Sequence, residues 1–275
     1  MSRSFQLVVC KDMGLHDVYL SQISPALSEG WTQERRKSVS ATRVNASLRT
    51  LRRALRMAEE WKLIKKVPKI KMLPGERQRE FVISETLLEK MLKHEDCTDM
   101  LLVLLPFLID VGLRISEATG LTWERVGLEP KQDASLGWVY IEKGKSKFAK
   151  RHVPLTPRAH DILEKLKKSS TSAFVFPAAK KGRLSRHWAS EQFRTLRDAM
   201  KLPDDCVIHS TRHTFCTRLR ESGADAFTIM KLAGHSSIVI SQRYVHPTGE
   251  RLENAITKMG QVNGKADAKR EEEKK

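Results

Sequence analysis

A short stretch rich in proline, glycine and charge divides this chain into two segments of different character. The stretch spans residues 65–80 and holds two prolines and a glycine among many Lys, Arg and Glu residues. Proline and glycine interrupt helices and strands, and charged side chains keep a segment in water. We therefore expect a linker here, with one domain at 1–75 and a second at 81–260. A chain of 275 residues is long enough to give both of them a hydrophobic core.

Positive charge is concentrated in the first of these segments. Residues 35–79 contain fifteen Lys and Arg but only three acidic residues, a net of +12 out of the formal net charge of +17. A surface that uses charge only for solubility usually mixes both signs. An excess of this size predicts a polyanionic partner, which is either nucleic acid or an anionic membrane surface.

The apolar residues argue against a membrane protein. The longest apolar run, residues 100–109, contains Pro106 and ends at Asp110, whereas a spanning helix needs about 20 apolar residues. The N-terminus lacks the apolar stretch of a signal peptide, and the four cysteines are scattered without a Cys-x-x-Cys pair. A disulfide framework and a zinc ribbon are therefore not expected. These features predict a cytoplasmic protein with reduced cysteines and a nucleic-acid partner.

The basic segment has the periodicity of an amphipathic helix near 43–61. Its apolar residues recur at spacings of three and four, the period of one helix face: Val44, Leu48, Leu51, Leu55 and Ala58. Four arginines, which we call the arginine stripe, lie about 130° around the same helix: Arg49, Arg52, Arg53 and Arg56. We expect the apolar face to pack and the arginine stripe to bind nucleic-acid phosphate. The alternative is a solvated helix face.

The second segment is predominantly helical in pattern, with a few strand patterns. Helices are expected near 84–92, 98–110, 115–119, 157–168, 187–200, 211–222, 225–233, 237–243 and 249–260. Strands are expected at 138–142, 148–155 and 174–176. The predicted fold class is therefore mainly α with a small antiparallel β-sheet. The polar tail, residues 261–275, is expected to be disordered.

Four short motifs in the second segment carry residues capable of chemistry. They are Gly112-Leu-Arg-Ile-Ser-Glu117, a basic hairpin from Gly144 to Leu155, His209-Ser-Thr-Arg-His213, and Gly234-His235 followed by Arg243-Tyr244. Arg212 and His235 are 23 residues apart, and Tyr244 follows nine residues later. In their order and in these two spacings the motifs resemble the tyrosine recombinase, or phage integrase, family over roughly residues 81–260.

The resemblance implies a role for each motif residue. Arg114, Arg212 and His235 would hold the scissile phosphate, Lys145 would be the general acid, His209 would assist proton transfer, Tyr244 would be the nucleophile, and Glu117 would brace Arg114. It also implies a helical N-terminal DNA-binding domain that is minimal or truncated, double-stranded DNA as the substrate, and self-association on DNA as a tetrameric synapse. Neither ATP nor a metal is implied, so no cofactor is expected.

These residue types suit the transesterification of a phosphodiester. Its pentacoordinate state carries extra negative charge on the nonbridging oxygens, which forked guanidinium donors match. A side-chain oxygen stays bound to phosphorus as water cannot. Only about one free tyrosine in a thousand is ionised at pH 7, so the nucleophile needs a base or a cationic pocket. The leaving oxygen needs a proton, which a lysine on a hairpin can bring. No carboxylate cluster suggests Mg²⁺.

The residues by themselves leave alternatives open. Arg114 could cap a helix C-terminus or simply pair with Glu117. Lys143 or Lys147 could replace Lys145, because all three lie in one basic hairpin.

Other classes of site and protein are also compatible with parts of the pattern. His209 and His213 are four residues apart, as in some zinc sites, but no zincin glutamate lies between them. Tyr244 taken alone could be a core residue. Residues 223–237 would pass as the helix-turn-helix of a non-catalytic DNA-binding protein. A type IB topoisomerase would use the same chemistry without site specificity.

The segment after the tyrosine raises a separate question. Its apolar residues form a stripe too small to be a core by itself: Leu252, Ala255, Ile256 and Met259. The stripe could fold back on its own domain. The resemblance implies instead that it docks on a neighbouring protomer.

Overall fold

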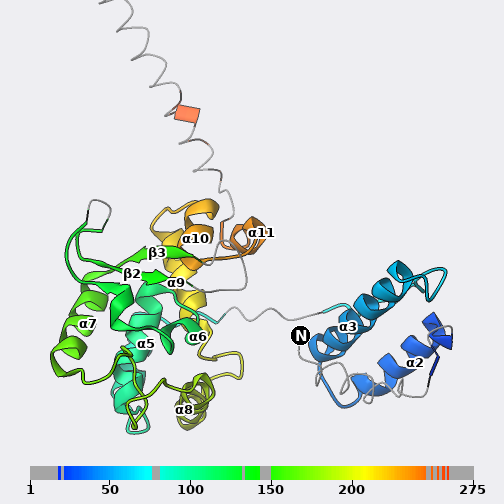
Figure 1. Ribbon diagram of the computed structural model, residues 1–275, viewed down its shortest axis with the longest axis horizontal. Coiled ribbons are helices and arrows are strands. Elements are labelled where there is room, and N and C mark those ends of the chain that lie inside the picture. Colours follow the sequence, from blue (N-terminus) through cyan, green and yellow to red (C-terminus); the bar gives the residue numbers. More distant parts are fainter. Residues whose placement is uncertain are drawn as a thin grey trace, which may run out of the picture. The chain divides into compact units, whose positions relative to one another are not determined.

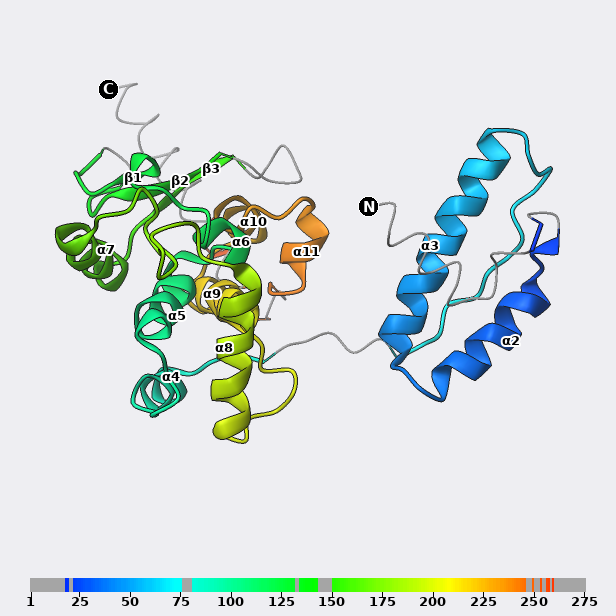
Figure 2. The same cartoon turned by 60° about the horizontal axis from the view of Figure 1, so that its bottom comes forward.

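The chain divides into two units, Met1–Gln78 and Arg79–Lys275, whose main elements are labelled in Figures 1 and 2. The computed structural model describes residues 18–19, 22–75, 81–131, 134–142 and 150–245, and after them positions 249, 253, 256, 257 and 259. No helix in these described ranges is long and apolar enough to cross a membrane.

In the described part of the first unit, two helices pack together. Helix α3 (Ala41–Glu60) coincides with the predicted basic helix, and all five of its predicted apolar residues are buried. Helix α2 (Pro25–Arg36) packs against it. The sequence analysis did not predict α2, although its start is conventional: the Ser24 side chain accepts from the Leu27 amide, and Pro25 takes the first helical position.

The predicted linker is partly wrong, because the chain after α3 folds back onto the first unit. Ile70 is buried in the same core as α3. Asn45 fixes this return with two hydrogen bonds: its amide nitrogen donates to the Leu73 carbonyl and its amide oxygen accepts from the Leu73 N–H, both at 2.8 Å. An isolated apolar residue between prolines and lysines gave too weak a signal to predict this packing.

Helix α5 lies at the centre of the second unit in Figures 1 and 2. It packs against α4, α7, α8 and α9, and its apolar character on nearly every side reflects this burial. The helices of the second unit, within the described ranges, are α4 (Glu85–Leu92), α5 (Asp99–Val111), α6 (Ile115–Ala118), α7 (Pro157–Ser169), α8 (Arg186–Ala199), α9 (Ser210–Glu221), α10 (Ala226–Ala233) and α11 (Ile238–Gln242), with a 3-10 turn, η2, at Trp123–Arg125. Eight of the predicted helices are confirmed to within a few residues at each end, and most of the ninth, 249–260, lies outside the described residues.

A three-stranded antiparallel sheet completes the second unit. Its strands are β1 (Val126–Gly127), β2 (Trp138–Ile141) and β3 (Arg151–Pro154), in the spatial order β1-β2-β3. Val139 pairs with Val153, and both are buried. The mainly helical fold with a small antiparallel sheet is thus confirmed. The strand predicted at 174–176 is wrong: Phe174 makes only an isolated bridge with Thr122.

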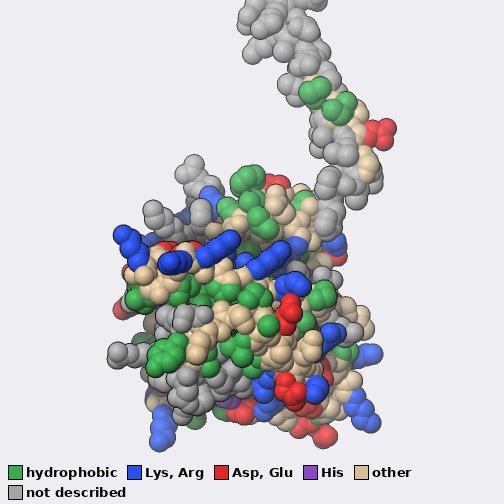
Figure 3. Space-filling view, turned by 90° about the vertical axis from the view of Figure 1, so that its right-hand side faces the viewer, with side chains coloured by type: hydrophobic (Ala, Val, Ile, Leu, Met, Phe, Trp, Pro, Cys, Tyr) green, Lys and Arg blue, Asp and Glu red, His purple; other side chains and the backbone are tan. Residues whose placement is uncertain are grey.

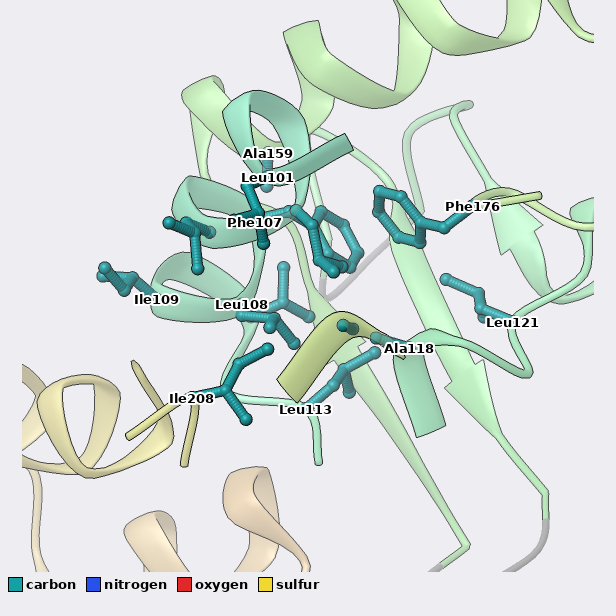
Figure 4. Close-up of a cluster of buried hydrophobic side chains, with 14 of the residues drawn as sticks. Leu101, Phe107, Leu108, Ile109, Leu113, Ala118, Leu121, Ala159, Phe176 and Ile208 are labelled. Carbon is teal, nitrogen blue, oxygen red and sulfur yellow. The ribbon is translucent and has the colours of Figure 1, made fainter. Parts of the chain in front are cut away.

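The main core joins α5 to the loops and helices around it (Figure 4). The Phe107 and Phe176 rings meet with their centroids 5.0 Å apart. Phe176 is buried and packs into this core from a loop. The central helix is fixed in this core, and its C-terminal end leads directly into the candidate site.

Candidate active site

Two helices end in glycines at the site, and both glycines are required by their surroundings. Gly112 ends α5 with φ of 65°, and Gly234 ends α10 with φ of 63°. Residues with side chains rarely adopt this left-handed conformation. A Cβ on Gly112 would also overlap the Phe215 ring, and one on Gly234 would lie 2.6 Å from Nη1 of Arg151. The glycines of two motifs thus have a physical explanation.

Arg212 joins these two helix ends. Its Nη1 donates to the Gly112 carbonyl at 2.7 Å, and its Nη2 donates to the Ala233 carbonyl. Helix C-termini carry partial negative charge, so they favour a cation placed between them. The side chain is buried, and burial, followed by the charge of Arg114, lowers the pKa of Arg212 to about 10. Arg212 therefore remains a guanidinium at neutral pH.

Arg114 lies at the N-terminus of α6 and pairs with Glu117 from the first turn. Glu117 accepts from the Arg114 backbone N–H at 2.9 Å and from its Nη1 at 2.8 Å. The Nη2 of Arg114 donates to the Gly234 carbonyl at 2.7 Å. The predicted pairing with Glu117 is present, and the bond to Gly234, the C-cap of α10, shows that Arg114 also contacts a helix C-terminus. About 37% of the Arg114 side chain is exposed, so it remains accessible to a ligand.

Glu117 is a buried carboxylate held ionised by its neighbours. Burial alone would raise its pKa, but hydrogen bonds and charge from Arg151, with further contributions from Arg114, keep the pKa of Glu117 below its ordinary value. The carboxylate therefore stays negative and fixes the guanidinium groups beside it.

His235 follows the turn that both arginines contact. Its ring is buried, and Nδ1 lies 2.8 Å from the Ser241 hydroxyl. Burial, followed by the charges of Arg212 and Arg114, lowers the pKa of His235 to about 3. The imidazole is therefore neutral at physiological pH. In the tautomer whose Nδ1 accepts from the Ser241 hydroxyl, the proton is on Nε2, where it can be donated to a phosphate oxygen.

Tyr244 packs among two histidines and a cysteine. Its ring centroid lies 5.0 Å from that of His213 in an edge contact and 6.4 Å from that of His235 in a nearly parallel one. The hydroxyl shares a hydrogen bond with the Cys216 thiol. Burial, helped by Cys216, raises the pKa of Tyr244 to about 12, while Arg212 acts in the opposite direction. Without DNA the phenol is therefore protonated.

The two other predicted catalytic residues, His209 and Lys145, are not placed in this network by the contacts above. His209 is exposed at the N-cap of α9, three residues before Arg212. Lys145, like the alternatives Lys143 and Lys147, lies outside the described residues. In the part of the chain that the structure describes, no group of three or more His, Cys, Asp and Glu side chains gathers to hold a metal ion.

The arginine stripe lies in the first unit, on α3. Its four side chains line a shallow hollow of about 460 Å³. Basic side chains also gather in a row on the face of the molecule shown in Figure 3. Among the described residues these four arginines line the hollow, and their guanidinium groups are suited to an anion with several oxygens.

Three residues that the sequence analysis did not select also belong to the network. Ser241 contacts His235, Cys216 contacts Tyr244, and Arg151 contacts Glu117 with its side chain 2% exposed. Cys216 lies four residues after Arg212, so helical spacing could have placed it near the site. Arg151 gave no such signal, because it is one of many basic residues in the predicted hairpin.

Comparison with known proteins agrees with this arrangement. Residues 80–251 match the model of the phage integrase family. The tyrosine recombinase XerC of Rhodospirillum centenum is 33% identical over 154 residues, which are 54% of this chain and 43% of XerC. The XerD protein of Brucella suis is 31% identical over 163 residues, which are 56% of this chain and 50% of XerD. The match thus spans about half the length of these curated relatives.

Solved structures show the same fold. A Tn1549 transposon integrase in complex with transposon right end DNA superimposes with a TM-score of 0.77 at 19% identity, over 94% of this chain and 95% of that one. A lambda integrase tetramer bound to a Holliday junction superimposes with a TM-score of 0.69 at 18% identity, over 86% and 73%. The family model covers more than half of the sequence and includes every described contact of the candidate site, so this chain belongs to the phage integrase family.

Proposed function

We propose that this chain is a site-specific DNA recombinase that cleaves and rejoins DNA through Tyr244. One observation carries the proposal. The turn from Ala233 to His235 is held by both Arg212 and Arg114, and the Tyr244 ring lies beside the histidine of that turn. Two guanidinium groups, a neutral imidazole and a phenol thus surround one position, as phosphoryl transfer to a tyrosine requires.

The reaction exchanges one phosphodiester for another. The Tyr244 oxygen forms a bond to the scissile phosphorus, the bond from phosphorus to the 5′ oxygen breaks, and a 3′-phosphotyrosine and a 5′-hydroxyl result. The phenol gives up its proton, with His209 assisting, and Lys145 donates one to the 5′ oxygen. Attack by a second 5′-hydroxyl on the phosphotyrosine reverses these steps and rejoins the strand, so no external energy source is needed.

The arginines and His235 divide the binding of the phosphate between them. Arg114 and Arg212 neutralise the charge on the nonbridging oxygens, and losing one such preorganised donor typically costs about 2.7–4 kcal/mol of transition-state stabilisation. His235 adds a neutral N–H donor because its pKa is low. Because the pKa of Tyr244 is about 12, the phenol keeps its proton in the free protein. The proton must therefore be removed once DNA is bound.

Both units would bind DNA. Residues 1–75 would form a helical core-binding-like domain, and residues 81–260 would form the catalytic domain. The arginine stripe would contact the backbone phosphates of double-stranded DNA. We extend to this chain the tetrameric assembly of the lambda integrase structure, so that two sites are joined by four protomers. Such an enzyme would act beside its DNA in the cytoplasm.

A covalent trapping experiment tests this proposal. A suicide DNA substrate, nicked so that the freed strand diffuses away, should accumulate an SDS-resistant adduct with the wild type. Tyr244→Phe should form none while it binds DNA normally, because the change removes one oxygen and no charge. Tyr140→Phe is the matched control and should retain the adduct. Recovery and sequencing of the attached DNA would identify the target site.

Three outcomes would contradict the proposal. An adduct with Tyr244→Phe would assign the nucleophile to another residue, and no adduct with the wild type on any DNA would favour a non-catalytic DNA-binding protein. Relaxation of arbitrary supercoiled plasmid would instead indicate a topoisomerase.

A further inference from the structure

A buried arginine on β3, Arg151, contacts residues of the candidate site. Its side chain is 2% exposed. Nη2 donates to Oε2 of Glu117 at 2.9 Å, and Nη1 donates to Oε1 at 3.3 Å. The two parallel donations form the forked geometry that guanidinium and carboxylate groups favour. A buried charge pair of this kind is held in one orientation, because separating the two groups would leave both charges buried and unpaired.

Glu117 is shared between Arg151 and Arg114. The same two carboxylate oxygens accept from Arg114, Oε1 from its Nη1 and Oε2 from its backbone N–H. The orientation of the carboxylate therefore sets the position of the Arg114 guanidinium, and Arg151 sets the orientation of the carboxylate.

Arg151 also holds the turn that leads to His235. Its Nε donates to the Leu232 carbonyl at 2.8 Å, and its guanidinium occupies the space next to Gly234 that a Cβ would need. The Gly234 carbonyl in turn accepts from Nη2 of Arg114. One arginine thus touches both supports of the phosphate site, the Glu117 carboxylate and the end of α10.

We propose that Arg151 is a positioning residue that fixes Arg114 and the His235 turn in the geometry needed for cleavage. The inference rests on the proposed function. Arg151 does not bind the phosphate itself, because its side chain is buried and its guanidinium donates to Glu117 and to the end of α10. It acts through its neighbours, and outer contacts of this type commonly change activity by about 10–100-fold.

The test compares Arg151→Met and Arg151→Lys with a matched control, Arg158→Met. Arg158 also bridges elements of the second unit through ion pairs, with Asp110 and Glu85, and has no described contact with the site. For each full-length variant, thermal unfolding, half-site DNA binding and single-turnover cleavage of the suicide substrate are measured. Arg151→Lys keeps the charge opposite Glu117 but loses the fork, so it remains informative if Arg151→Met does not fold.

We expect Arg151→Met to cleave about 10–100-fold more slowly with DNA binding within twofold of the wild type, and Arg151→Lys to recover part of that loss. Arg158→Met should lose stability but cleave at the wild-type rate once bound. Wild-type cleavage separates the two proposals, because its absence would refute the recombinase assignment itself. Folded Arg151→Met or Arg151→Lys that cleaves as fast as the wild type would overturn the positioning role.

A double variant tests whether Arg151 acts through Arg114. In an Arg114→Lys background, the Glu117 carboxylate that Arg151 holds no longer positions a guanidinium at residue 114. Adding Arg151→Met should therefore cause a much smaller further decrease in rate than it causes in the wild type. Decreases that multiply fully would mean that the two arginines act independently and would also overturn the inference.

Discussion

Replacing Gly234 by alanine should damage the site more than its small size suggests, and the structure gives two separate reasons. The left-handed conformation at Gly234 costs a residue with a Cβ about 1–2 kcal/mol. The new Cβ would also lie 2.6 Å from the Arg151 guanidinium, and overpacking of this kind typically costs about 1–3 kcal/mol. We therefore expect a destabilisation of about 2–5 kcal/mol from the two effects together.

Gly223 is the matched control, because it separates the conformational cost from the steric overlap. It lies in the same unit with φ of 95°, and a Cβ there would meet nothing within 4 Å. Gly223→Ala should cost only the conformational part, about 1–2 kcal/mol. Urea unfolding followed by circular dichroism measures both variants, and the cleavage rate should fall only for Gly234→Ala. If Gly234→Ala is no more destabilising than Gly223→Ala, the close approach of Arg151 to Gly234 does not exist in solution.

Three further predictions concern binding, assembly and pH. Neutralising the whole arginine stripe should weaken DNA binding and reduce the slope of log affinity against log salt by about 0.9 for each phosphate that the protein no longer neutralises. An unchanged slope would mean that the stripe does not contact DNA. Deleting residues 250–275 should impair assembly on paired sites more than half-site binding, because Ile256 and Met259 are exposed and would dock on a neighbouring protomer. Native gel shift measures both, and assembly equal to that of the intact protein would mean that these residues pack on their own protomer. Stability should fall as pH drops from about 6.5 towards 3, since unfolded His235 takes up a proton that the folded ring, with a pKa of about 3, refuses. This group changes the free energy of unfolding by at most about 1.4 kcal/mol per pH unit. In His235→Asn, the slope of the free energy of unfolding in urea against pH should decrease by up to that amount between pH 6.5 and 4.

Local signals in the sequence predicted most of the second unit correctly. Ser84 and Thr98 cap their helices as N-cap residues do, and Gly112 ends α5 where the apolar run stops. The motif residues Arg114, Arg212, His235 and Tyr244 were selected because their chemical types and spacings are unusual. Each of these features depends on a few residues that are close in the sequence, so it can be predicted without the tertiary structure.

The features that were missed depend on contacts between distant segments. Arg151 is 34 residues from Glu117 and 81 from Leu232, and nothing in a basic hairpin distinguishes a cationic side chain that points inward from those that face solvent. The return of residues 62–73 onto α3 likewise depends on Asn45, 28 residues from Leu73. Burial of a polar residue is decided by the partner that satisfies it, and the partner is not visible in the local pattern.

The placement of Arg212 between the ends of α5 and α10 makes part of the protein's charge independent of its surroundings. The arginine stripe faces solvent, where mobile ions at about 0.15 M screen charges beyond about 8 Å. Arg212 is buried and is balanced by fixed backbone dipoles, which dissolved ions cannot replace. Rising ionic strength should therefore slow the loading of DNA yet leave the chemical step on loaded DNA nearly unchanged. DNA affinity would thus vary with ionic strength while the rate of cleavage on bound DNA would not.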